Sequence, residues 1–392
     1  MSSIQLADQI FVLLKHWLVG RVPVSLQPVV GILITVIPII CVFPALFAIT
    51  TILERKGLGR IQNRYGPNRT GPFGILQPLA DGVKALTKED IVPANADKVV
   101  HFFAPVVLVM LVFLAYAVLP MGRNMAAVDL DCGVLFFFAI GSGTEVAVFM
   151  AGWSSRNKYA LLGAMRAIAQ MISYEIPLIL SAVAAIMIAG TLNLQQIVTQ
   201  QAGYSGIFPH WYVFTPWGFA AFLLFIISAT AESNRSPFDL PEGESEIIAG
   251  YYIEYSGFKF ALFFLGEYLG MFSISAIAIT LFLGGWAAPF SFLTWVPSWL
   301  WFFAKLVTMI LCFIWVRGTL PRLRQDQLMN FAWKFMLPMA LVVLTSAACW
   351  RYTEGWQRWA ISFLVVIIPY SWLGHGMMSN RKLEQRKYRF AE

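Results

Sequence analysis

Long apolar stretches alternate with short polar segments along the whole chain. Each stretch is close to the roughly 20 residues that an α-helix needs to cross the hydrocarbon core of a bilayer. Aromatic residues gather at the ends of these stretches, as at Trp211, Trp217 and Trp299, which is typical of a membrane–water interface. The pattern predicts nine membrane-spanning helices, at residues 28–53, 99–120, 132–152, 160–190, 213–231, 258–284, 298–317, 333–350 and 357–374.

Composition supports this interpretation. Of the 392 residues, 58% are hydrophobic and only 12% are charged, whereas soluble globular domains carry about 25% charged residues. So few charges cannot cover a water-facing surface. We therefore expect an all-α polytopic integral membrane protein, with one membrane domain over residues 1–392 and amphipathic interfacial helices between the spans.

The distribution of Lys and Arg predicts the orientation. The polar segments fall into two alternating sets, and most basic residues lie in the set 54–98, 153–159, 232–257, 318–332 and 375–392. The other set (1–27, 121–131, 191–212, 285–297 and 351–356) contains only Lys15, Arg21, Arg123 and Arg351. The positive-inside rule assigns the first set to the cytoplasm and the N-terminus to the outside. Residues 1–24 do not resemble a signal peptide, because Asp8 interrupts the apolar stretch and the basic residues come late.

The cysteines and histidines argue against a redox centre or metal site in this chain. None of the four cysteines lies in a CxxC pair, so neither an iron–sulfur nor a structural zinc site is indicated. The four histidines are scattered at segment ends, whereas a bis-His haem requires two facing intramembrane histidines. We expect no metal ligands here.

The first basic segment contains an amphipathic helix. In GILQPLADGVKALTKE, residues 74–89, apolar and polar residues form opposite stripes at helical spacing. At this length the helix is too short to span, so we expect it to lie in the interface. Its polar face either contacts water or, in the sharper hypothesis, directs Asp81 and Lys84 into a protein-enclosed cavity.

Ionisable residues within the apolar spans are the main functional signal. Each costs about 2.5–3.5 kcal/mol at the bilayer centre on insertion scales, and such residues usually face a bundle interior or a water path. One buried glutamate is often a structural hydrogen-bond partner. Several, together with Glu232 and Glu254 at the ends of the spans that flank the acidic loop, favour a proton path, and the intramembrane members are Glu145, Glu175 and Glu267.

Helical periodicity places Glu175 about 180° from a second polar stripe on the same span. That stripe comprises Arg166, Gln170, Ser173 and Tyr174. A helix that is polar on two opposite sides should be surrounded by protein rather than lipid.

Acidic residues are concentrated in one short segment, residues 231–255. It carries a net charge of −5 against +7 for the whole chain, so the remainder carries +12. The segment has no EF-hand spacing and is not a predicted Ca²⁺ site. It is either an ordinary solvated loop or a partner for the basic first loop, against which its charge would let it fold.

Two of these stretches carry a family resemblance. GILQPLADGVKALTKE and PFDLPEGESEIIAG are similar to the signatures of the family formed by the H subunit of complex I, and ERKGLGRIQNRYGPN adds a third match. Members of this family are the membrane subunit of NADH–quinone oxidoreductase that is related to mitochondrial subunit 1. The predicted helix 357–374 resembles the extra C-terminal helix of longer members.

The resemblance implies residue roles. The quinone chamber would include Glu54, Arg55, Asp81, Lys84 and Arg235. The acidic loop that responds to quinone chemistry would include Asp239, Glu242, Glu244, Glu246 and Glu254. The proton relay would comprise Glu145, Glu175, Glu232 and Glu267. No residue is assigned as catalytic, and the chain is not an enzyme alone.

The resemblance also implies the surroundings of the chain. Quinone would be the substrate, while NADH, FMN and iron–sulfur clusters would belong to partner subunits. The partners would be peripheral iron–sulfur and quinone-site subunits, small membrane subunits and antiporter-like subunits, in a bacterial inner membrane. Two alternatives stay open: a homologous subunit of a membrane-bound hydrogenase, and a stand-alone transporter.

Overall fold

The computed structural model describes residues 7–239 and 249–379. Helices form almost all of the regular structure in these ranges. The exception is a short hairpin in which β1, Tyr204–Ser205, pairs antiparallel with β2, Phe208–Pro209. The predicted all-α membrane fold is confirmed.

The helices follow one another with short connections. Their bounds are α2 Ile10–Val19, α3 Gln27–Ile61, α4 Gln77–Thr87, α5 Lys98–Ala115, α6 Gly133–Ser154, α7 Lys158–Ala189, α8 Leu194–Gln201, α9 Pro216–Glu232, α11 Gly257–Phe282, α12 Ser298–Thr319, α13 Gln325–Phe331, α14 Leu337–Tyr352 and α15 Gln357–Ser379. Single turns lie at η1 Pro72–Gly74, η2 Tyr116–Val118, η3 Tyr212–Phe214, η4 Gly250–Tyr252 and η5 Ser291–Leu293, and the π-helical turn η6 Ala332–Met336 joins α13 to α14.

Within the described ranges, eight helical segments are long and apolar enough to cross a membrane. They match eight of the nine predicted spans. The ninth prediction, 213–231, corresponds to α9, which has only 17 residues. The difference arises because residues 212–214 form the turn η3 and the helix begins at Pro216, a favourable first helical position.

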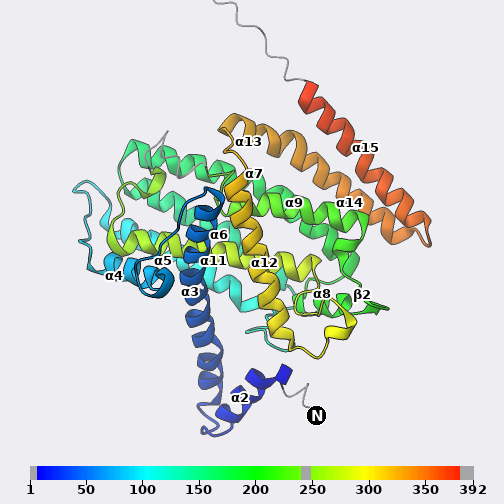
Figure 1. The fold of residues 1–392 in the computed structure, drawn as a ribbon, viewed down its shortest axis with the longest axis horizontal. Helices are drawn as coiled ribbons and strands as arrows, with labels where there is room; N and C mark the ends of the chain where they lie inside the picture. The colour runs from blue at the N-terminus through cyan, green and yellow to red at the C-terminus, as the bar shows by residue number, and fades with distance from the viewer. Residues whose placement is uncertain (1–6, 240–248, 380–392) are drawn as a thin grey trace, which may run out of the picture.

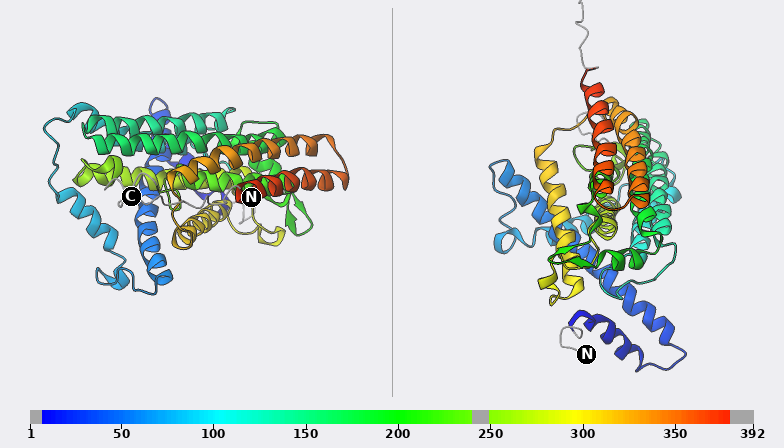
Figure 2. Two further views of the ribbon diagram at one scale, coloured as in Figure 1. Left: turned by 90° about the horizontal axis from the view of Figure 1, so that it is seen from above. Right: turned by 90° about the vertical axis from the view of Figure 1, so that its right-hand side faces the viewer.

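Most spans form a bundle that two helices cross. Figure 1 shows α5, α6, α7, α9, α11 and α14 running along the long axis of the molecule, with α3 and α12 running across it. In Figure 2, α15 lies along the edge beside α14, and α2 lies beside the N-terminal end of α3, away from the bundle. The crossing brings the C-terminal end of α3 against α11 and α12.

The core of the bundle is centred on α11. In its most apolar window 72% of the residues are buried, against 6% for α3 and for α15. Small residues allow close packing around it: Ala147, Ala151, Ala164 and Ala167 are all fully buried between α6 and α7. Most side chains in the apolar part of α11 are therefore enclosed by protein.

Candidate functional site

A buried charge network lies at the C-terminal end of α3. Glu54 is only 5% exposed, and its carboxylate accepts a hydrogen bond from the Tyr268 hydroxyl at 2.5 Å. Arg235 Nη1 lies 3.4 Å from Glu54 Oε1, and Arg317 forms an ion pair with the same oxygen. The Arg235 guanidinium also stacks 3.8 Å from the centre of the Tyr268 ring. Two cations thus share one carboxylate; Glu54 and Arg235 are buried, and the Arg317 side chain is 29% exposed.

The network keeps Arg235 charged. Burial opposes the charge on its guanidinium, but the nearby Tyr268 and Glu54 raise the pKa of Arg235 above its ordinary value. The site therefore holds a fixed excess of positive charge. Such an arrangement is suited to stabilising negative charge that develops beside it.

A second, more open group forms where α4 meets α3. Arg55 Nη1 lies 2.6 Å from Asp81 Oδ2, and Gln77 donates to Asp81 Oδ1 at 3.0 Å. Burial alone would raise the pKa of Asp81, but the hydrogen bonds from Arg55 and Gln77 outweigh it and lower that pKa. Lys84 Nζ is 3.9 Å from Asp81, and its side chain is 75% exposed.

The predicted chamber residues therefore fall into two groups. Glu54 and Arg55 are consecutive and point to different sides of α3, so the first joins Arg235 and the second joins Asp81. The described residues of this chain leave the Lys84 side chain open, so the hypothesis that Lys84 faces an enclosed cavity stays a prediction. The apolar stripe of α4 is also uncovered, because Leu79 and Leu86 are exposed.

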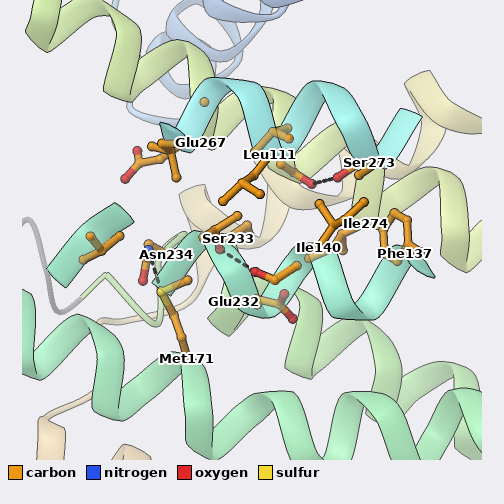
Figure 3. A pocket seen from close by; sticks show the side chains of 18 of the residues that line it. Leu111, Phe137, Ile140, Met171, Glu232, Ser233, Asn234, Glu267, Ser273 and Ile274 are labelled. Carbon is orange, nitrogen blue, oxygen red and sulfur yellow. Dashed lines mark hydrogen bonds between the residues drawn. The ribbon is translucent and has the colours of Figure 1, made fainter. Parts of the chain in front are cut away.

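A small cavity separates two of the predicted relay acids. It has a volume of about 70 Å³, and its lining includes Glu232 at the end of α9 and Glu267 on α11. Figure 3 shows these two side chains on different walls of the cavity, with Ser233 and Asn234 between them. One water occupies roughly 10–15 Å³ of such space, so the cavity is large enough for a short water chain.

The other two relay acids lie beyond Glu232. Ser142 on α6 donates a hydrogen bond to Glu175 on α7. The Glu232 carboxylate is close enough to interact electrostatically with both Glu175 and Glu145. All four predicted relay acids are partly buried, so none is directed wholly at lipid.

The opposite side of α7 is also covered by protein. Gln170 is fully buried, and its Nε2 donates to the carbonyl oxygens of Ala231 and Phe238 at 2.6 and 2.7 Å. The two polar sides of this helix thus face α6 and the end of α9, which agrees with the expectation that both are covered by protein. Gln170 also fixes the chain that leads from Glu232 into the acidic segment.

One helix connects the charge network to the relay cavity. Glu267 and Tyr268 are neighbours on α11, and successive helical residues point about 100° apart. Glu267 lines the cavity, while Tyr268 bonds Glu54 in the charge network. The two sites therefore share a single, deeply enclosed structural element.

The acidic segment is described only at its ends. Glu242, Glu244 and Glu246 lie outside the described residues. The Asp239 carbonyl oxygen accepts a hydrogen bond from Arg322. Glu254 accepts one from Asn157 at 2.7 Å and lines a different cavity from the relay acids. The structure thus does not bring Glu254 to the relay.

The end of the first loop contacts the start of α11, just beyond the acidic segment. Lys259 pairs with Asp90 at 2.7 Å, and the backbone N–H of Ile91 donates to Ser256 Oγ at 2.9 Å. These contacts do not include the acidic side chains of residues 231–255, so the expectation that the two segments fold against each other stays a prediction.

Several residues of the site were not predicted from the sequence. Arg317 is the last residue of the predicted span 298–317, where a basic residue indicates only a membrane interface. Tyrosines carry little signal in a chain that is 15% aromatic. The omitted residues that bond the predicted acids are Ser142, Tyr251, Tyr252, Tyr268 and Arg317.

Comparison with known proteins places most of the chain in one family. Residues 34–348 match the family model described as NADH dehydrogenase. A protein from Dehalococcoides mccartyi, named as the H subunit of NADH-quinone oxidoreductase, is 50% identical over 296 residues, which cover 76% of this chain and 80% of the relative.

Relatives with the same name cover still more of the chain. The Polaromonas naphthalenivorans protein is 42% identical over 343 residues, or 85% of this chain and 94% of its own length. The Rickettsia typhi protein is 44% identical over 342 residues, or 85% and 96% of the two chains. The chain therefore belongs to the NADH dehydrogenase family of multi-pass membrane proteins that includes the H subunit of NADH-quinone oxidoreductase, or complex I.

Proposed function

We propose that this chain forms the membrane side of a quinone chamber and links quinone reduction to proton translocation through its buried acids. The observation that carries the proposal is the placement of Glu267 and Tyr268 on α11. The first lines the relay cavity, and the second belongs to the Glu54 network. A change at one site therefore has a direct route to the other.

The chamber would lie where the Glu54 network and the Arg55–Asp81 pair flank the end of α3. Reduction of a quinone consumes two electrons and two protons, and it generates negative charge before the protons arrive. The fixed positive charge of Arg235 and Arg317 would stabilise that intermediate charge. The electrons would come from an iron–sulfur cluster in a neighbouring peripheral subunit, and NADH and FMN would also bind in partner subunits.

The relay would then carry the charge change along the bundle. Protonation of the reduced quinone would alter the balance of charge around Glu54 and its partner Tyr268. Glu267 would pass the change in charge across the cavity to Glu232. Glu232 would pass it on to Glu175 and Glu145. Antiporter-like subunits would receive the change at the far end.

The proposed setting is a bacterial inner membrane with the N-terminus outside. Lys and Arg in alternate polar segments support this orientation. The exposed stripe of α4 and the open Lys84 would be covered by lipid and by a peripheral subunit, respectively.

The test is to replace Glu175, Glu232 or Glu267 with Gln in the assembled enzyme. We expect proton pumping per NADH to fall about tenfold or more in at least one variant, because Gln cannot bind and release a proton. Glu354→Gln is the matched control, since Glu354 is exposed. Normal quinone reduction with normal pumping in all three relay variants would remove the proposal.

A further inference from the structure

Two tyrosines near the C-terminal end of the acidic segment contact the carboxylate of Glu267. Tyr252 donates a hydrogen bond to Glu267 Oε1, and the Tyr251 hydroxyl lies 3.1 Å from the same oxygen. The two hydroxyls are also 2.6 Å apart. Tyr251 is 1% exposed and Tyr252 is 3% exposed, so these contacts are shielded from water. Hydrogen bonds to an ionised carboxylate are about twice as strong as neutral ones.

The turn that carries the tyrosines is tightly held. Gly250 in η4 has a φ of +55°, which favours glycine. A Cβ added to Gly163 on α7 would lie 2.6 Å from the Gly250 Cα, so the two backbones are in contact. Phe263 of α11 packs edge-on against both tyrosine rings at 5.7 and 5.6 Å. A displacement of η4 must consequently move either α7 or the tyrosines on Glu267.

We infer that Tyr251 and Tyr252 are positioning residues that fix the Glu267 carboxylate and tie it to the turn η4. The inference rests on the proposed relay function. In it, a displacement of η4 changes the hydrogen bonding of Glu267. The tyrosine hydroxyls thereby act on the first acid of the relay without touching quinone.

The chain supplies a matched control for this role. Tyr255 lies three residues after Tyr252, is 5% exposed and packs on the same Phe263 ring at 4.8 Å. Its hydroxyl lies 3.2 Å from Ser154 Oγ, whereas the other two tyrosine hydroxyls contact Glu267. Tyr255→Phe therefore removes a buried hydroxyl from the same cluster without altering the contacts of Glu267.

The experiment is a double-mutant cycle in the assembled complex. Tyr252→Phe, Tyr251→Phe and Tyr255→Phe are each made alone and combined with Glu267→Gln. Protons pumped per NADH, quinone reductase rate and NADH oxidation by an artificial acceptor are measured. We expect Tyr252→Phe to lower pumping per NADH about tenfold in the native background, and to have no further effect beside Glu267→Gln. Tyr255→Phe should leave pumping per NADH unchanged both in the native background and beside Glu267→Gln.

Each other outcome overturns a defined claim. Normal pumping in Glu267→Gln would exclude Glu267 from the relay, and would overturn this inference with it, while the relay proposal as a whole falls only if Glu175→Gln and Glu232→Gln also pump normally. Lost pumping in Glu267→Gln with normal pumping in Tyr252→Phe and Tyr251→Phe would overturn the inference alone. An equal loss of pumping from Tyr252→Phe beside native Glu267 and beside Glu267→Gln would also overturn the inference. Reduced assembly of the complex, with all activities lost in proportion, would make the hydroxyls structural and likewise reject the inference.

Discussion

At the scale of single residues, the shared carboxylate of Glu54 is the most informative contact. Arg235, Arg317 and Tyr268 all bond it, and each comes from a different segment of the chain. Buried charges that lose a partner are strongly destabilising, because the remaining charge stays desolvated. The network is therefore sensitive to each of its members.

Arg317 gives the first prediction. Arg317→Gln removes one of the two cations on Glu54, so we expect quinone reductase turnover to fall about tenfold while NADH oxidation by an artificial acceptor is retained. Arg324→Gln is the control, because the Arg324 side chain is 78% exposed and pairs only with exposed Asp326 among the contacts described. Equal turnover in the two variants would contradict a role for the network.

Asp81 gives a prediction about pH. Its folded-state pKa lies below the ordinary value of 3.8, so the contribution of the Arg55 pair is present above that value and is lost as pH falls through the lowered pKa. The pair is therefore intact throughout the neutral range. Asp81→Asn should lower quinone reductase turnover by the same factor across about pH 6–8, because Asp81 does not titrate there.

The measurement for Asp81 is a turnover profile against pH in the assembled complex. Asp326→Asn is the control, since the Asp326 side chain is 63% exposed. An effect of Asp81→Asn that appears at only one end of the pH range would refute the assignment.

At the scale of elements, α11 is held at its far end by a lysine within the apolar span α12. Lys305 Nζ donates to the carbonyl oxygens of Leu283, Gly285 and Ala287 at 2.7, 2.8 and 2.7 Å. Its ammonium also lies 4.1 Å from the centre of the Trp211 ring. Carbonyl groups at a helix C-terminus lack partners within the helix, and a cation there also favours the helix dipole.

Lys305→Met tests this arrangement. It leaves three carbonyl groups without their donor, each unsatisfied buried group costing about 1–3 kcal/mol, so we expect a lower melting temperature of the purified complex. Lys98→Met is the control, because Lys98 is exposed at the start of α5. Unchanged thermal stability in Lys305→Met would show that the carbonyls do not depend on the ammonium.

At the scale of the whole molecule, the last helix, α15, contributes little to the buried core of the bundle. The family match ends at residue 348, before α15. In its most apolar window α15 is 6% buried, and it is joined to α14 by a hydrogen bond between Ser346 and Ser362 at 2.7 Å. α13, by contrast, buries Leu328 completely, and the Leu328 carbonyl oxygen accepts from Tyr174 at 3.0 Å.

A truncation pair follows from this difference. Removing residues 354–392 should leave quinone reductase activity within about twofold of the intact complex, because few core contacts are lost. Removing residues 325–392 should prevent assembly, since it also takes α13 and α14 out of the core. Activity and subunit content of the purified complex are the measurements. Loss of activity in the shorter deletion would assign α15 a functional role.

The sequence by itself determined the helices, their approximate ends and the acids of the site. Spans are recognisable from local apolar length, and Glu145, Glu175 and Glu267 are conspicuous because charge is costly among apolar residues. The start of α9 was misplaced by a few residues, because the turn η3 has the same apolar composition as the helix that follows it.

The tertiary structure alone decided which side chains meet. Tyr268 is 214 residues from Glu54, and Arg317 is 263 residues from it. Such partners depend on where α3 and α12 cross the bundle, and helix crossing is set by packing over whole helix faces rather than by any local pattern. The division of the predicted chamber residues into two groups, and the tyrosine contacts of Glu267, were undetectable in the sequence for the same reason.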